Sequence, residues 1–102
     1  MRVETALSFY SRYVGLMGKA SIAPDYALYI GDCRQVHTWF MRFAIDVVFV
    51  DENCIALEIF ENVLPWRITK KVKNAEGCLE LSAGSAKKRG MRVGKKCIVG
   101  AD

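Results

Sequence analysis

The sequence is poor in the residue types on which common functional sites depend. Its 102 residues include one histidine, two prolines and four cysteines, and no two cysteines form a C-x-x-C pair. A single histidine excludes a site built from several histidines, and isolated cysteines give no zinc-finger spacing. The sequence also contains no G-x-S-x-G motif and no phosphate-binding glycine loop. We therefore expect no metal and no cofactor, and no motif assigns a covalent reaction.

Long apolar runs are missing as well. Runs such as Val47–Val50 are far too short to cross a bilayer, so no membrane span is expected. Near the start of the chain, Glu4 stands where the apolar core of a signal peptide would begin, which favours a cytoplasmic protein. In a reducing cytosol we expect the cysteines to be thiols that act as small apolar residues, with two disulfides or a split four-cysteine metal site as alternatives. These residues are Cys33, Cys54, Cys78 and Cys97.

Charge is distributed unevenly along the chain. The net charge is +4, but residues 1–63 hold five basic and eight acidic side chains, whereas residues 64–102 hold ten basic and three acidic ones. Such an asymmetry marks either a nucleic-acid-binding surface or a solvated face that keeps a small protein soluble. We favour the solvated face because few aromatic residues lie among the lysines.

What the chain does contain is a set of short apolar segments suited to strands. An apolar fraction of 52% over 102 residues supports a single domain, residues 1–102, with its own core. Alternating or continuous apolar residues predict strands over residues 3–8, 26–30, 35–42, 46–50, 55–59, 78–81 and 97–99. Their spacing of roughly ten residues predicts a mostly β fold, an antiparallel β-sandwich or jelly-roll-like barrel with one or two short helices.

The helices and turns are predicted from their own signals. Apolar residues recur at helical spacing over residues 9–17, and a second helix is predicted over residues 83–89 with Gly90 following its end. Residues 51–53 predict a hairpin turn, after which Ile55, Leu57 and Ile59 would share an inward face. Pro65 excludes a central strand where it stands, so residues 66–74 are predicted to form a loop or an edge strand.

The residues that could carry chemistry lie in and around the predicted strand over residues 35–42. The side chains that alternate between its two faces are bulky on both faces, so neither face is expected to be open to water. Asp46 heads an apolar run and needs a partner when buried, and a guanidinium from Arg42 or Arg67 is expected to supply it. Trp39 and Trp66 could line a pocket for a flat ring or a sugar, or could belong to the core.

The candidate ligand-binding site is a hypothesis about how the chain folds back on itself. It requires the bend at Pro65 to lie beside the imidazole of His37. The alternative is structural: the same polar side chains would hold the strands and the Pro65 loop together. The candidate ligand-binding residues are His37, Trp39, Arg42, Asp46, Trp66 and Arg67.

The same region resembles a known family. The string from His37 to Asp51 is similar to the central block of an uncharacterised bacterial and archaeal family, domain of unknown function 192 (uncharacterised protein family 0127). The resemblance implies an all-β, jelly-roll-like fold and no agreed activity. Because many relatives carry secretion leaders, it also leaves the compartment open. Further blocks agree in order and spacing, namely Gly15–Gly18, Asn62–Arg67, Leu79–Gly84 and Gly90–Gly94.

Three functions of different classes follow. We favour a non-enzymatic binding or accessory module, a monomer or weak dimer, for a small polar or aromatic ligand or a protein partner. The second hypothesis is a hydrolase or isomerase in which Asp46 orients His37 as a general acid or base. The third and least favoured is nucleic-acid binding through the basic C-terminal third, which would weaken steeply with salt.

Overall fold

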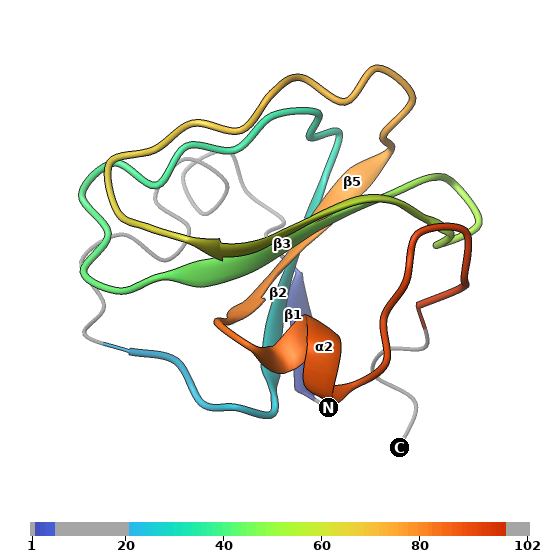
Figure 1. Cartoon of the computed structure of the whole chain (residues 1–102). Coiled ribbons are helices and arrows are strands. Elements are labelled where there is room, and N and C mark those ends of the chain that lie inside the picture. Colours follow the sequence, from blue (N-terminus) through green and yellow to red (C-terminus); the bar gives the residue numbers. More distant parts are fainter. Residues whose placement is uncertain (1, 6–20, 98–102) are drawn as a thin grey trace.

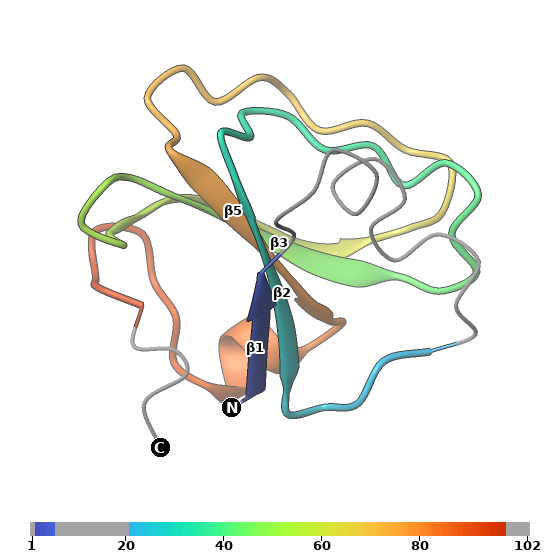
Figure 2. The ribbon, with the colours of Figure 1, turned by 180° about the vertical axis from the view of Figure 1, so that it is seen from behind.

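The computed structural model describes residues 2–5 and 21–97, which form one five-stranded sheet and a short helix. The sheet order is β1-β2-β5-β3-β4 (Figure 1 and Figure 2). Strands β2, β5, β3 and β4 pair antiparallel, whereas β1 joins β2 in parallel at the edge. The predicted mostly β, antiparallel fold class is confirmed. The elements are β1 (Arg2–Thr5), β2 (Tyr26–Gly31), β3 (Ile45–Val50), β4 (Ala56–Val63), β5 (Gly77–Ser82) and α2 (Ser85–Lys88).

Most of the predicted elements are found within a few residues of their expected places. The strands predicted over residues 26–30, 46–50 and 78–81 are β2, β3 and β5. The helix predicted over residues 83–89 is α2, and Gly90 follows it in the left-handed conformation, with φ of 70°. The helix predicted over residues 9–17, the end of the first predicted strand and residues 98–99 of the last one lie outside the described residues.

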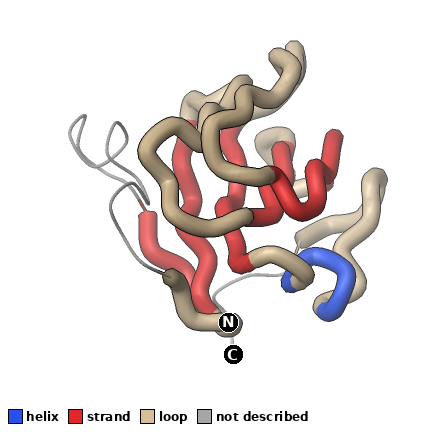
Figure 3. The backbone as a smooth tube through the Cα atoms, turned by 60° about the vertical axis from the view of Figure 1, so that its left-hand side comes forward, coloured by secondary structure: helices blue, strands red, loops and turns tan. Residues whose placement is uncertain are grey.

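Alternation along the strands gives the sheet two buried faces. Long loops over residues 32–44 and 64–76 cover one of them, which we call the loop face, and α2 with the segment after it covers the other, the helix face (Figure 3). Val36 and Val72 pack from the two loops onto the loop face, while Ala86 packs from α2 onto the helix face. Every residue of β3 is buried because both faces are covered, which explains its continuous apolar sequence.

The prediction that Ile55, Leu57 and Ile59 share one inward face is wrong for the strand that forms there, β4. The pairing between β3 and β4 shifts register between Phe49 and Val50. This β-bulge reverses the alternation, so that Leu57 packs against the loop-face core and Ile59 against the helix-face core. The hairpin turn before β4 is confirmed, since Oδ1 of Asp51 accepts hydrogen bonds from the backbone N–H groups of residues 53 and 55 at 2.8 and 2.9 Å.

The predicted strand over residues 35–42 is also wrong. The segment belongs to loop 32–44 and pairs like a strand at a single bridge, between His37 and Ile68. A turn follows at Trp39 and Phe40, where φ of Phe40 is 65°. The expectation that water reaches neither side of this segment fails as well, because Thr38 is buried while His37 and Trp39 are exposed. The prediction of a loop over residues 66–74 is confirmed.

Candidate functional site

Loops 32–44 and 64–76 run side by side over the loop face (Figure 1). The N–H of Thr38 donates to the carbonyl oxygen of Arg67 at 2.8 Å, and further backbone hydrogen bonds continue the pairing toward residue 72. His37 and Ile68 face each other in the antiparallel bridge. The expectation that the bend at Pro65 lies close to His37 is therefore confirmed.

Thr38 fixes the bend. Its side chain is fully buried, and Oγ1 donates to the carbonyl oxygen of Leu64 at 2.6 Å while accepting from the N–H of Arg67 at 2.9 Å. Its own carbonyl oxygen accepts from the N–H of Trp66 at 3.1 Å. Thr38 was not among the residues predicted to form the site. The sequence signal for its role is a hydroxyl on the inward side of an apolar segment, because a buried hydroxyl requires a hydrogen-bond partner.

The two loops carry most of the exposed large hydrophobic side chains. In the described part of the chain six such residues are exposed, and all except Val93 lie in these loops. Large exposed apolar side chains that gather on one surface indicate an interaction site, whereas isolated ones are ordinary. We call the five loop residues the aromatic surface: Trp39 (45% exposed), Phe40 (64%), Leu64 (48%), Trp66 (57%) and Ile68 (56%).

Two rings of the aromatic surface sit on unusual backbone. Phe40 and Trp66 have φ values of 65° and 63°, in the left-handed region that favours glycine and asparagine. Their ring centroids are 4.8 Å apart in an edge-to-face arrangement with an interplanar angle of 60°. Left-handed backbone costs a bulky residue about 1–3 kcal/mol, and such costs cluster at functional sites. The Phe40–Trp66 pair is therefore both accessible to a partner and held on backbone that lowers the stability of the fold.

Basic side chains accompany the aromatic surface. The His37 ring packs on the Trp39 ring with centroids 4.7 Å apart. Arg67 is exposed beside Trp66, and its Nη1 donates to the Trp66 carbonyl oxygen at 3.3 Å. Arg42 is exposed in loop 32–44. The structure thus brings together four of the six predicted residues on the paired loops and places a fifth, Arg42, in one of the same loops.

Asp46 is not part of this arrangement. The carboxylate lies in β3 with no exposed area, where Oδ1 accepts from the N–H of Asn62 and Oδ2 from the N–H of Ala86, both at 2.9 Å. The predicted pairing of Asp46 with Arg42 or Arg67, and its predicted orientation of His37, are wrong. The physical reason is that backbone N–H groups of β4 and α2 already satisfy both of its oxygens. Asp46 joins three elements and has a structural role.

A second buried carboxyl group, which was not predicted from the sequence, lies on the loop face. Glu80 of β5 pairs with Leu28 of β2 and Val47 of β3, and it is 5% exposed. Burial raises the pKa of Glu80 to about 8, with the nearby Cys33 as a smaller cause. At neutral pH the group is therefore mostly a neutral acid. The signal was in the sequence, because a glutamate inside a strand with two buried faces must itself be buried.

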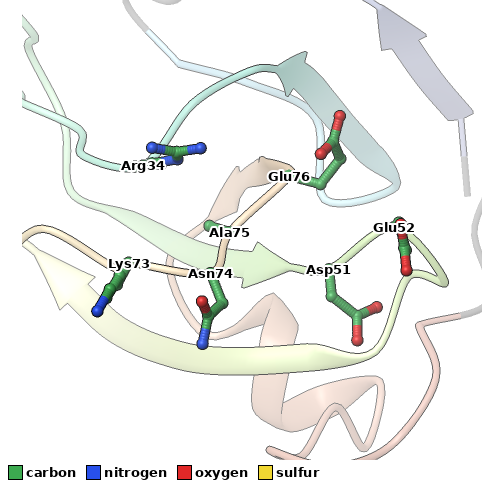
Figure 4. Close-up of a pocket in the computed structure, with 7 residues that line it drawn as sticks. All are labelled: Arg34, Asp51, Glu52, Lys73, Asn74, Ala75 and Glu76. Carbon is green, nitrogen blue, oxygen red and sulfur yellow. The ribbon is translucent and has the colours of Figure 1, made fainter.

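A polar pocket lies at the other end of the loops, beside the β3–β4 hairpin. Its volume is about 380 Å³. The cations Arg34 and Lys73 lie on one side and the carboxylates lie on the other (Figure 4). Apart from Asp51 and Ala75 the lining residues are exposed, which indicates a solvated surface hollow. The lining residues are Arg34, Asp51, Glu52, Lys73, Asn74, Ala75 and Glu76.

Comparison with known proteins identifies the family. Residues 1–99 match the sequence profile of DUF192, described as "Uncharacterized ACR". The chain belongs to the DUF192 family. No curated protein matches this DUF192 chain. Within the described residues, the structure holds no helix that is both long and apolar enough to cross a membrane.

Two solved structures share the fold of this DUF192 domain. A protein of unknown function from Novosphingobium aromaticivorans has a TM-score of 0.84 at 20% identity, over 94% of this chain and 73% of the other. A protein described as "a putative transcription regulator" from Sinorhizobium meliloti has a TM-score of 0.78 at 28% identity, over 92% of this chain and 78% of the other. Neither description names a ligand.

Proposed function

We propose that this DUF192 domain is a non-enzymatic binding module whose aromatic surface docks a protein partner. The observation that carries the proposal is the pair formed by Phe40 and Trp66, two exposed rings on left-handed backbone. Folding alone favours glycine or asparagine at such positions, so the two rings need another reason to be there. Contact with a partner supplies that reason, because aromatic residues contribute most of the binding energy in many interfaces.

A protein partner fits this surface better than a small molecule does. Small-ligand sites are concave and enclose most of the ligand. The side chains of the aromatic surface are 45–64% exposed, more than is expected of residues that enclose a ligand. An exposed apolar patch with a polar rim has the composition of a protein–protein interface.

The chemistry of the surface also limits the partner. His37 and Arg67 adjoin the rings, and loop 32–44 adds the exposed Arg42. Charge complementarity favours a partner segment that combines apolar or aromatic side chains with aspartate or glutamate. Arginine would then contribute both ion pairs and contacts to aromatic faces.

The two rival functions have weaker support. Asp46 is engaged by backbone N–H groups, so the general acid or base proposed for an enzyme lacks its orienting carboxylate. The basic residues that suggested nucleic-acid binding are divided between the two sides of the sheet, because loop 64–76 covers the loop face and α2 the helix face. A nucleic-acid strand would need them on one surface.

Tryptophan fluorescence tests the proposal directly. Both tryptophans of the chain, Trp39 and Trp66, belong to the aromatic surface. We would select a displayed random-peptide library on the whole chain and titrate the enriched peptides while following tryptophan emission and its quenching by acrylamide. The expected result is enrichment of peptides with aromatic and acidic residues that shift the emission to shorter wavelength and protect it from the quencher.

Matched variants separate docking at this surface from nonspecific binding. Phe40→Asn and Trp66→Asn remove a ring at a position where asparagine is tolerated, and each is expected to lower peptide affinity at least tenfold. Val93→Asn is the control, because Val93 is 61% exposed outside the aromatic surface, and it should bind as the wild type does. Equal binding by all variants, no enrichment, or saturation of the surface by a small aromatic compound such as indole would each overturn the protein-partner proposal.

A further inference from the structure

Two cysteines meet on the loop face. The thiol of Cys78 donates to Sγ of Cys33 at 3.5 Å, and the thiol of Cys33 donates to the carbonyl oxygen of Gln35 at 3.3 Å. A disulfide bond is about 2.05 Å long, so the two sulfur atoms need to approach by about 1.5 Å to be joined. We propose that Cys33 and Cys78 form an oxidisable dithiol, a modification site that converts reversibly to a disulfide.

The backbone holds both residues near each other. Cys78 lies in β5 and pairs with Ile30 of β2. Cys33 follows the end of β2 by two residues, and the N–H of Asp32 donates to the carbonyl oxygen of Glu76 at 2.6 Å. The two cysteines thus extend from the same pair of hydrogen-bonded strands. Rotation of the side chains and a small shift at the start of loop 32–44 are sufficient to bring the sulfur atoms together.

Exposure assigns different roles to the two thiols. Cys33 is partly exposed, whereas Cys78 has no exposed area. An oxidant such as hydrogen peroxide therefore meets Cys33 first, and Cys78 is placed to resolve the product.

The reaction balances with one molecule of peroxide. The Cys33 sulfur attacks one peroxide oxygen, the O–O bond breaks, and one water leaves as Cys33 becomes a sulfenic acid. The Cys78 sulfur then attacks the Cys33 sulfur, the S–O bond breaks, and a second water leaves. The two thiols lose two electrons and two protons in total, and the peroxide is reduced to two waters.

The other two cysteines provide a comparison within the same chain. The N–H of Cys97 donates to the carbonyl oxygen of Cys54 at 2.8 Å, so their backbones are neighbours. Among the described residues, however, no hydrogen bond joins their thiols. Burial raises the pKa of the Cys97 thiol, with Cys54 as a smaller cause, and this keeps the thiol protonated and slow to react. Because the thiols of Cys33 and Cys78 are already in contact, oxidation is expected to select that pair.

The disulfide would have a structural consequence. It would covalently attach the start of loop 32–44 to β5, under the loops that cover the loop face. The closed segment, residues 33–78, includes both loops together with β3 and β4. A cross-link over a segment of this length restricts the unfolded chain strongly, so the oxidised protein should have a Tm several degrees higher than the reduced protein.

Mass spectrometry of the intact chain tests the inference. The reduced protein would be treated with hydrogen peroxide, the remaining thiols blocked, and the products identified by intact mass and by non-reduced peptide mapping. We expect a product lacking two hydrogens, one peptide linking Cys33 to Cys78, the higher Tm, and full reversal by dithiothreitol. Cys54→Ser with Cys97→Ser should behave as the wild type does.

Several outcomes would contradict the inference. Cys33→Ser should abolish the cross-link and leave Cys78 unmodified, and Cys78→Ser should leave a sulfenic acid on Cys33 that a dimedone probe captures. A map dominated by Cys54–Cys97, by intermolecular disulfides or by random pairs overturns the proposal, as does an oxidised wild type with both thiols still available for blocking. The wild-type peptide map decides the question even where a serine variant fails to fold.

Discussion

The two faces of the sheet are covered by different means. On the helix face, α2 and the following segment pack apolar side chains such as Ala86 against the sheet. On the loop face, two loops without regular secondary structure supply the cover through residues such as Val36 and Val72. The loop face and its cover also hold the features that folding alone does not explain: the strained aromatic pair, the neutral Glu80 and the cysteine pair.

Each cover is held by a buried polar side chain that binds backbone groups, so the two faces can be compared. Asp46 ties α2 and β4 to β3 through two backbone N–H groups. Thr38 ties the Pro65 bend to loop 32–44 through one carbonyl oxygen and one N–H group. A buried polar side chain thus contributes to each cover, and on the loop face Thr69 adds a further link by accepting from the N–H of Val36. We infer that the additional features of the loop face belong to function, and four variants test that distinction.

The largest effect is expected on the helix face. Asp46→Ala removes both acceptors and leaves the buried N–H of Ala86 and the part-buried N–H of Asn62 without partners, which should lower the free energy of unfolding by about 4 kcal/mol. Asp51→Ala is the matched control, because Asp51 also accepts two backbone N–H groups but in a half-exposed turn where water can replace it. We expect about 1 kcal/mol there. Equal losses in urea unfolding would contradict the structural role given to burial.

The second effect concerns pH and the loop face. Because the folded pKa of Glu80 is about 8, well above the ordinary value of 4.5, the folded state holds a proton that the unfolded state releases between these values. The stabilisation is complete below about pH 4.5 and is lost as the pH rises to about 8. Glu80→Gln removes this dependence.

The comparison should be made across that pH range. Each pKa unit corresponds to about 1.4 kcal/mol, so Glu80→Gln should be more stable than the wild type by about 3 kcal/mol at pH 7, with a difference that shrinks toward pH 5. Glu61→Gln, at an exposed position of β4, is the control and should change nothing. Parallel stability profiles for wild type and Glu80→Gln would show that Glu80 is ionised when folded.

The third effect tests the anchor of the loops. Thr38→Val keeps the shape of the side chain but removes its hydrogen bonds to the carbonyl oxygen of Leu64 and the N–H of Arg67. We expect a loss of about 2 kcal/mol, faster amide exchange in both loops and little change in β3. Thr69→Val, which loses one contact to the N–H of Val36 at 3.1 Å, should cost about half as much. A uniform increase in exchange over the sheet would argue against a local anchor.

These anchors show what the sequence could and could not predict. Alternation and apolar runs were sufficient for β2, β3 and β5, since their burial follows from pairing on both sides. Over residues 35–42 the same alternation is present, with Val36 and Thr38 inward and His37 outward. No strand forms there because its neighbour, interrupted by Pro65 and the left-handed Trp66, offers a single bridge. Alternation of apolar residues predicts which side chains are buried. It does not predict whether the neighbouring segment is regular enough to pair with them as a strand.

The candidate site was predicted in part for a related reason. The residues of the two loops could be grouped because a proline bend and a polar segment tend to lie at a surface. Asp46 was grouped with them on charge alone, since arginine is the usual partner of a buried carboxylate. Its true partners are backbone N–H groups, which no side-chain pattern reveals. Phe40 was not singled out because its left-handed backbone has no signature in its residue type.

The smallest effect on stability is the most direct test of function on the loop face. Trp66→Asn relieves left-handed strain of about 1–3 kcal/mol and forfeits an aromatic contact worth about 0.5–1.5 kcal/mol, so the free energy of unfolding should change by less than about 1 kcal/mol or rise slightly. Trp39→Asn is the matched comparison, because Trp39 packs on His37 without positive φ and its loss brings no relief. Urea midpoints of the two variants measure the difference. If Trp66→Asn instead costs more than about 2 kcal/mol, the ring is part of the cover itself and the loop face resembles the helix face after all. If it costs nothing while peptide binding is lost, the exposed ring is kept at a folding cost for the contact it makes.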